Sequence, residues 1–291
     1  MPATDKEPRP PGQLRQILRA VSRDPKPKFV HHLRTTIRRT EALWQAHRLQ
    51  VSKKPRALAR QLAKLRRRAG KIRDLDIQIK LLASLNVGGN SVAKSRLREA
   101  LEERRRRREK KLLSELDGKG LKKLLKRLSQ VHSLINDASP ATPRPAQVER
   151  EWNNLRAGAA KLRTFSPEQL HEFRIRCKKI RYAAELLPPT AESAKLTKQL
   201  KTMQDAVGEW HDWLNLAQTA EDELSSPERA LLAAIRTIAQ AKFAEALRVC
   251  QRILREASFA RVSSEAPPQK KTVERSPFRG SPEAAANSAS A

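Results

Sequence analysis

Cysteine is scarce in this sequence, and long apolar runs are missing. Only two of the 291 residues are cysteines, Cys177 and Cys250, and each lies inside a helix-like pattern far from the other. This excludes a disulfide framework and fits a reducing compartment. No apolar run approaches the roughly 20 residues that cross a bilayer, and residues 1–12 lack the apolar core of a signal peptide. We therefore expect a cytoplasmic protein.

The residue sets that carry catalysis or hold a cofactor are missing as well. The spacing offers no carboxylate pair, Ser/His/Asp set, Cys/His pair or Gly-rich phosphate loop. The dipeptide His211-Asp212 is a feature of helical metal phosphohydrolases, but the rest of that ligand set is missing. The equivalent place in an internal repeat, described below, holds Arg73-Asp74, and a guanidinium is not an ordinary metal ligand. We expect no enzymatic activity, no metal and no cofactor.

Acidic residues are few beside the basic ones. The chain has 61 Lys and Arg against 31 Asp and Glu, a formal net charge of +30. A folded domain with that excess repels itself unless an anion offsets it, so an anionic polymer is the natural partner. Aromatic residues make up only 4%, which disfavours recognition of single-stranded nucleic acid because that relies on base stacking.

Helical periodicity is what the chain has in abundance. Apolar residues recur at helical spacing between residues 13 and 260, no alternating strand pattern persists, and Gly and Pro stand mainly at breaks. We predict an all-α fold at 13–260, with a flexible N-terminal tail at 1–12 and a disordered tail at 261–291. The Pro-rich stretch 138–145 is the best linker between two halves, about 13–137 and 146–260.

Two segments of the chain repeat one basic motif. The sequence HHLRTTIRR at 31–39 recurs as HEFRIRCKK at 171–179, and both follow the pattern HxxRxxx(R/K)(R/K) with a constant offset, 171 − 31 = 140. The duplication reaches a second helix, where Gly70 corresponds to Gly208 at an offset of 208 − 70 = 138. The change of offset falls between helices, so we predict two antiparallel helical bundles related by a pseudo-twofold axis.

Each repeated helix carries a cationic stripe beside an apolar one. At about 100° per residue, Arg34 and Arg38 fall within about 60° of His31, whereas Leu33 and Ile37 fall on a separate side. A rise of about 1.5 Å per residue spreads His31 and Arg38 over roughly 10 Å, long enough to meet successive phosphates of an extended polyanion. The stripes consist of His31, Arg34, Arg38, His171, Arg174, Lys178 and Arg181, with Arg39 and Lys179 further around.

At these residues the sequence resembles the CHAD family, the conserved histidine α-helical domains. The resemblance rests on VHHLRTTIRR, LHEFRIRCKKIRYAAELL and the companion helices LAKLRRRAGKIRDLDI and LKTMQDAVGEWHDWLNL, and it covers residues 13–260. It implies two helical bundles whose basic residues gather along a groove that binds inorganic polyphosphate, with binding rather than catalysis as the activity. It also implies a role on polyphosphate granules, and the chain looks like a stand-alone form.

The resemblance assigns the ligand to a defined set of residues. In the companion helices, Arg73 and His211 occupy the family's polar pair together with Asp74 and Asp212, and Arg66 lies on the same side as Arg73. One departure is Glu41, which stands where the family has another cation and where the second copy has Arg181, since 181 − 41 = 140. The implied polyphosphate-binding residues are His31, Arg34, Arg38, Arg39, Arg66, Arg73, His171, Arg174, Lys178, Lys179, Arg181 and His211.

Two alternatives stay open at the level of sequence. The same basic surface suits nonspecific binding to the phosphates of duplex nucleic acid. The densest basic run, ERRRRREKK at 103–111, is another possible contact, although the thin apolar stripe around it favours a solvated helix face.

Overall fold

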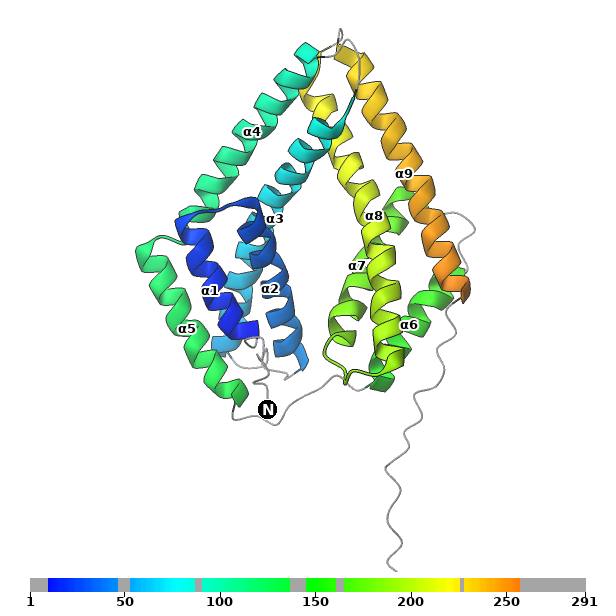
Figure 1. The fold of residues 1–291 in the computed structure, drawn as a ribbon. Helices are drawn as coiled ribbons and strands as arrows, with labels where there is room; N and C mark the ends of the chain where they lie inside the picture. The colour runs from blue at the N-terminus through cyan, green and yellow to red at the C-terminus, as the bar shows by residue number, and fades with distance from the viewer. Residues whose placement is uncertain are drawn as a thin grey trace, which may run out of the picture. The chain divides into compact units, whose positions relative to one another are not determined.

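The computed structural model describes residues 10–46, 53–86, 91–136, 145–160, 165–225 and 228–256. These residues form helices, with short turns at the junctions that are described, and contain no strand, which confirms the predicted all-α fold (Figure 1). The predicted linker and both predicted tails lie almost wholly outside the described residues, and the pseudo-twofold relation stays a prediction. In chain order the helices are α1 (Pro10–Arg23), α2 (Pro27–Ala46), α3 (Lys53–Ser84), α4 (Ser91–Leu113), α5 (Gly118–Asn136), α6 (Pro145–Ala160), α7 (Pro167–Ala184), α8 (Ala191–Glu223) and α9 (Arg229–Glu256).

Local signals fix where the functional helices begin. At the start of α7 the Ser166 hydroxyl accepts a hydrogen bond from the Gln169 backbone N–H at 3.3 Å, and the Gln169 side-chain oxygen accepts one from the Ser166 N–H at 2.8 Å. This capping box satisfies two backbone donors, and Pro167 at the first helical position has none to satisfy. Thr190 and Ser193 form the same arrangement at the start of α8. The frames of both helices are therefore set by their own first turns.

Three hydrophobic clusters hold the described helices together. The first takes residues from α1 to α5 and includes Leu33 and Ile37, and the second is built from α6 to α9 and includes Phe173 and Cys177. The third takes residues from α3 and α4 of the first half and from α8 and α9 of the second, with Trp213 among them. Because this cluster is shared, apolar burial joins the two halves directly.

The basic run at 103–111 of α4 has two parts with different roles. Arg104 pairs with Glu223 of α8, and the Arg105 Nε donates to Asp76 of α3 at 2.7 Å. Both arginines therefore connect α4 to neighbouring helices. The solvated face predicted from the sequence did not include these two ion pairs. Arg106 to Arg108 are exposed, as that prediction expects.

Candidate anion-binding site

The repeated helices α2 and α7 bury their apolar sides and so fix the direction of their cationic sides. Leu33 and Ile37 are fully buried in α2, and Phe173 and Cys177 are buried in α7. Helix α2 contacts α7, and α3 contacts α8. The two copies of the repeated motif therefore lie on helices that meet across the two halves. We use the name cationic strip for His31, Arg34, Arg38, His171, Arg174 and Lys178.

One arginine in each copy lies flat against the backbone of the companion helix. The Nε of Arg34 is 3.8 Å from the place a Cβ would occupy at Gly70, and the Nη2 of Arg174 is 3.2 Å from the corresponding place at Gly208. Glycine leaves this space open because it has no side chain. The duplicated sequence thus produces the same contact twice, and it is tighter in the second copy.

Two aspartates from the companion helices stand among these cations. Arg34 Nη1 lies 3.4 Å from the Asp74 carboxylate, whose side chain keeps 45% of its surface exposed. Burial raises the pKa of Asp74, while Arg34, Arg174 and Lys178 act in the opposite direction. Burial likewise raises the pKa of Asp212 to about 6, against the influence of Arg174 and Lys178. Asp74 belongs to the first half, whereas Arg174 and Lys178 belong to the second, so charges of the second half act on a carboxylate of the first.

The cations of the two halves also act on one another. The pKa of Lys178 is lowered to about 6, first by burial and then by Arg174, Arg38 and Arg34. Burial is the main cause of the lowered pKa of Arg174, and Arg38 lowers it further. Like charges at this range disfavour the charged form. The strip therefore concentrates positive charge from both halves in one place, and an anion bound there would relieve that repulsion.

Each copy contributes one histidine to the strip, and His211 of α8 stacks on the one from the second copy. The rings of His171 and His211 stack with centroids 4.8 Å apart, and the Nδ1 of His211 lies 3.0 Å from the amide nitrogen of Asn215. Burial, and after it Arg174, lower the pKa of His211 to about 4. In the first copy, burial and then Arg73 lower the pKa of His31. Near neutral pH these imidazoles are uncharged and offer one N–H donor each.

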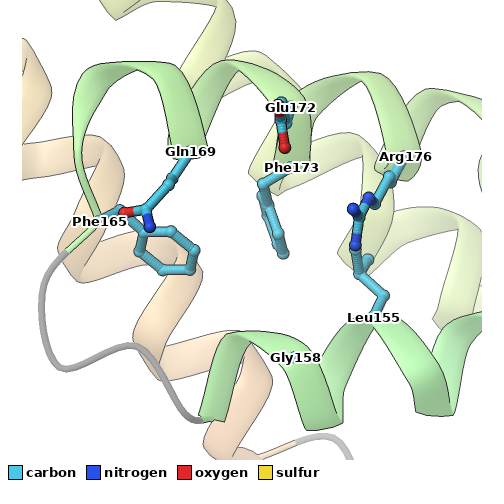
Figure 2. Close-up of a pocket in the computed structure, with 7 residues that line it drawn as sticks. All are labelled: Leu155, Gly158, Phe165, Gln169, Glu172, Phe173 and Arg176. Carbon is cyan, nitrogen blue, oxygen red and sulfur yellow. The ribbon is translucent and has the colours of Figure 1, made fainter.

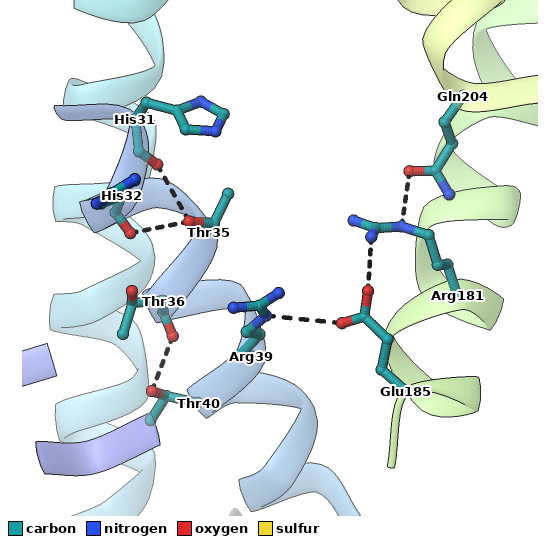
Figure 3. A network of polar contacts seen from close by, with 9 residues as sticks. All are labelled: His31, His32, Thr35, Thr36, Arg39, Thr40, Arg181, Glu185 and Gln204. Atoms are coloured by element: carbon teal, nitrogen blue, oxygen red, sulfur yellow. Dashed lines mark hydrogen bonds and ion pairs between the residues drawn. The ribbon is translucent and has the colours of Figure 1, made fainter. Parts of the chain in front are cut away.

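The end of the strip is closed by two carboxylates, of which the sequence pointed to Glu41 but not to Glu185. The Glu185 carboxylate accepts from Arg181 at 2.6 Å and pairs with Arg39 of α2 at 3.6 Å, so it connects the two halves (Figure 3). In the first copy Arg66 pairs with Glu41 at 3.0 Å. These contacts occupy Arg39, Arg66 and Arg181, all three of which the sequence assigns to ligand binding.

Positions 41 and 66 of the first copy correspond to 181 and 204 of the second, and the two pairs have opposite polarity. In the first copy Glu41 accepts from Arg66, whereas in the second copy Arg181 Nε donates to the Gln204 side-chain oxygen at 3.1 Å. The interhelix contact is thus kept while its charges differ. Lys179, the remaining predicted contact, is exposed on α7.

A separate pocket lies between α6 and α7, away from the strip. It has a volume of about 190 Å³, and its lining includes the two phenylalanines Phe165 and Phe173 together with Glu172 and Arg176 (Figure 2). On the α7 wheel its residues fall about 100° to 200° from His171, on the far side from Arg174 and Lys178. Because a carboxylate stands beside its single arginine, this pocket does not suit a polyanion.

The described residues lack two kinds of feature. They contain no group of three or more His, Cys, Asp or Glu side chains able to hold a metal ion. None of the described helices is long and apolar enough to cross a membrane.

Comparison with known proteins identifies the family. The sequence model of the CHAD domain matches residues 12–221 of this chain, which therefore belongs to the CHAD family. A crystal structure of the CHAD domain from the plant Ricinus communis is similar in fold, with a TM-score of 0.65 and 19% sequence identity over 86% of this chain and 89% of that chain. No curated protein matches the sequence. Helix α9 lies beyond the stretch matched by the family model, although it packs on α8.

Proposed function

We propose that this protein binds inorganic polyphosphate along the cationic strip and does not catalyse a reaction on it. The observation that carries the proposal is the convergence of Arg34 and Arg38 of one half with Arg174 and Lys178 of the other: α2 contacts α7, and besides burial, neighbouring arginines lower the pKa values of Arg34, Arg174 and Lys178. A linear chain of phosphates supplies closely spaced negative charge over the length that these residues cover.

The chemistry of the side chains suits phosphate oxygens. Guanidinium groups donate in a planar fork that matches two oxygens at once, and the amine of Lys178, with its lowered pKa of about 6, is favoured in its charged form by an anion bound beside it. The buried Nε of Arg174 has no hydrogen-bond partner among the described residues, so the protein itself does not satisfy this guanidinium fully. Binding through such contacts releases counterions and weakens steeply as salt concentration rises.

The test is a titration of labelled long-chain polyphosphate with variants of the strip. Replacing Arg34, Arg38, Arg174 and Lys178 together by Glu should abolish binding while far-UV circular dichroism stays helical. A second variant with Gln at the same positions avoids buried like charges and should lose binding as well. The matched control changes the exposed α5 lysines Lys119, Lys122, Lys123 and Lys126 to Gln, and it should keep most of the affinity. Unchanged affinity in both strip variants would refute the site.

Duplex nucleic acid is the second candidate ligand, because the same cations would attract its phosphates. Competition separates the two: duplex DNA at equal phosphate concentration should fail to displace polyphosphate. If it displaces polyphosphate readily, the protein is a general polyanion binder. Orthophosphate release on adding Mg²⁺ or Mn²⁺, lost on mutation of His211 and Asp212, would overturn the non-enzymatic part of the proposal.

Association with polyphosphate granules follows from the proposed binding. A fluorescent fusion of the full chain should gather on granules, and the Gln variant of the strip should stay diffuse. Diffuse wild-type protein in granule-containing cells would contradict this part of the proposal.

A further inference from the structure

We propose that the bound polyanion continues from the cationic strip onto a row of four exposed cations on α3 of the first half, and not onto α8 of the second. We call these residues, Arg56, Arg60, Arg67 and Lys71, the α3 row. The inference rests on the proposed function and adds a second stretch of binding surface to it. It also gives the ligand a direction, since the corresponding surface of the other copy has a different charge.

The four cations share one side of α3. With Asp74 at zero on a helical wheel, they fall between about 0° and 60°, next to the place where Arg34 packs on Gly70. From Arg56 to Lys71 the row extends roughly 22 Å along the axis at about 1.5 Å per residue. All four residues are exposed. The row is therefore a continuous cationic edge, longer than the stripe on α2.

Neighbouring cations of α3 are engaged in ion pairs and those of the row are not. On one side Lys64 and Arg68 pair with Glu115 at 2.8 and 2.9 Å. On the other side Arg66 pairs with Glu41. The α3 row has no ion pair or side-chain hydrogen bond with any other described residue, so its charges are available to an external anion.

The row begins where the strip ends. Burial raises the pKa of Glu41, and the residues that lower it are Arg66, then Arg38 and then Arg67. Arg38 of the strip and Arg67 of the row therefore both act on the Glu41 carboxylate. A polyanion leaving Arg38 meets Arg67 next and then has the rest of the row along the same helix.

The second copy lacks this surface. At the offset of 138, the α3 row corresponds to Ala194, Lys198, Asp205 and Glu209 of α8, which are also exposed. Four positive charges are replaced by one positive and two negative charges, and Glu209 pairs with Lys242 of α9 at 2.9 Å. Like charge would repel a polyanion from this side, so only the first half can extend the path.

The experiment compares two variants that lose the same number of exposed positive charges. One changes Arg56, Arg60, Arg67 and Lys71 to Gln, and the control changes the α5 lysines Lys119, Lys122, Lys123 and Lys126 to Gln. Glutamine is a good helix former, so both variants should fold. The probes are long-chain polyphosphate and tripolyphosphate, titrated at several salt concentrations.

The α3 variant should bind long-chain polyphosphate roughly tenfold more weakly, and its plot of log K against log salt should be shallower by about three, as expected for the loss of four phosphate contacts. Tripolyphosphate, which is too short to leave the strip, should bind both variants and the wild type equally. Equal weakening of long-chain binding by the two variants, or no weakening by the α3 variant, would overturn the inference.

A gain-of-charge variant provides an independent measurement. Asp205→Arg places a cation at the α8 position that corresponds to Arg67, and it should tighten long-chain binding about twofold to threefold. No tightening would show that the charge at this position does not decide which half the polyanion follows, against the inference. If the wild type binds no polyphosphate, or the strip variants bind it as the wild type does, the proposed function itself fails. If the strip variants lose binding but the α3 variant keeps wild-type affinity, only the extension onto α3 is refuted.

Discussion

The two copies of the repeated module share a geometry but differ in how their cations are neutralised. In the first copy Arg34 lies near Asp74, and Arg66 pairs with Glu41. In the second copy Arg174 and Lys178 have no carboxylate within ion-pair distance among the described residues. The comparison teaches that backbone contacts, such as an arginine over a glycine, are the repeated element. Charge balance is set separately in each half, and among the described contacts of the strip only Arg34 of the first half has a carboxylate within ion-pair distance.

The largest difference between the copies should come from filling the two glycine positions. A Cβ at position 208 would stand 3.2 Å from Arg174 Nη2, whereas a Cβ at position 70 would stand 3.8 Å from Arg34 Nε, an ordinary contact. Gly208→Ala should push Arg174 aside and weaken polyphosphate binding about fivefold to tenfold, while Gly70→Ala should change it by less than about twofold. Titration of both variants checks this.

Unfolding in urea supplies the control for the glycine pair. Alanine is favoured over glycine inside a helix by up to about 1 kcal/mol, so Gly70→Ala should raise the free energy of unfolding. Gly208→Ala should raise it less, because Arg174 has to move. If Gly208→Ala leaves binding at the wild-type level, the contact does not position Arg174 for the ligand.

An intermediate effect is expected from pH. As pH falls through about 6, Lys178 gains a proton and Asp212 loses its negative charge. The groups acting on Lys178 are Arg174, Arg38, Arg34 and Asp212, so both changes add positive charge to one site. Affinity for polyphosphate should therefore rise several-fold between pH 7.5 and 5.5 at constant salt.

The double variant Lys178→Arg/Asp212→Asn is the matched control for this pH dependence. Arginine stays charged and asparagine stays neutral across the range, so the affinity of this variant should vary much less with pH. Wild-type affinity that is flat or falls on acidification would contradict the assignment of these two groups.

The smallest effect should come from exchanging the pair at the end of the strip. The variant Glu41→Arg/Arg66→Gln gives the first copy the Arg–Gln pair that the second copy has at positions 181 and 204. It removes a carboxylate near Arg38, so affinity should rise about twofold. Glu41 and Arg66 are both partly exposed, and the free energy of unfolding should change by less than about 1 kcal/mol.

Single replacements test whether this exchange acts as a pair. Glu41→Arg alone sets two arginines against each other and should lower the free energy of unfolding, and Arg66→Gln should then restore it. Additive effects of the two changes, measured in a double-mutant cycle, would show that positions 41 and 66 do not interact.

Sequence alone predicted the helical faces well, because a helix presents residues at a fixed angular spacing. Leu33 and Phe173 are buried at equivalent places, and Arg34 and Arg174 both lie on the sides that the wheel gives them. The start of α7 is equally local, because Ser166, Pro167 and Gln169 of its first turn set it. Such predictions depend only on neighbours along one helix.

Ion-pair partners could not be predicted in the same way. The pair between Arg39 and Glu185 joins helices that are far apart in sequence, and its formation depends on how those helices are placed in space. Arg105 illustrates the same limit, because it stands within a run of five arginines and yet pairs with Asp76 of another helix. A wheel gives the face on which a charge lies, but the partner depends on which helix packs against that face.

The apolar cluster shared by α3, α4, α8 and α9 sets a minimum size for this fold. If the first half stood by itself, Leu75, Leu82, Leu97 and Leu101 would lose the residues of α8 and α9 that lie in the same cluster. An uncovered surface of that kind promotes association. A single copy of the module would leave this surface uncovered, whereas in this chain each half covers the apolar residues of the other.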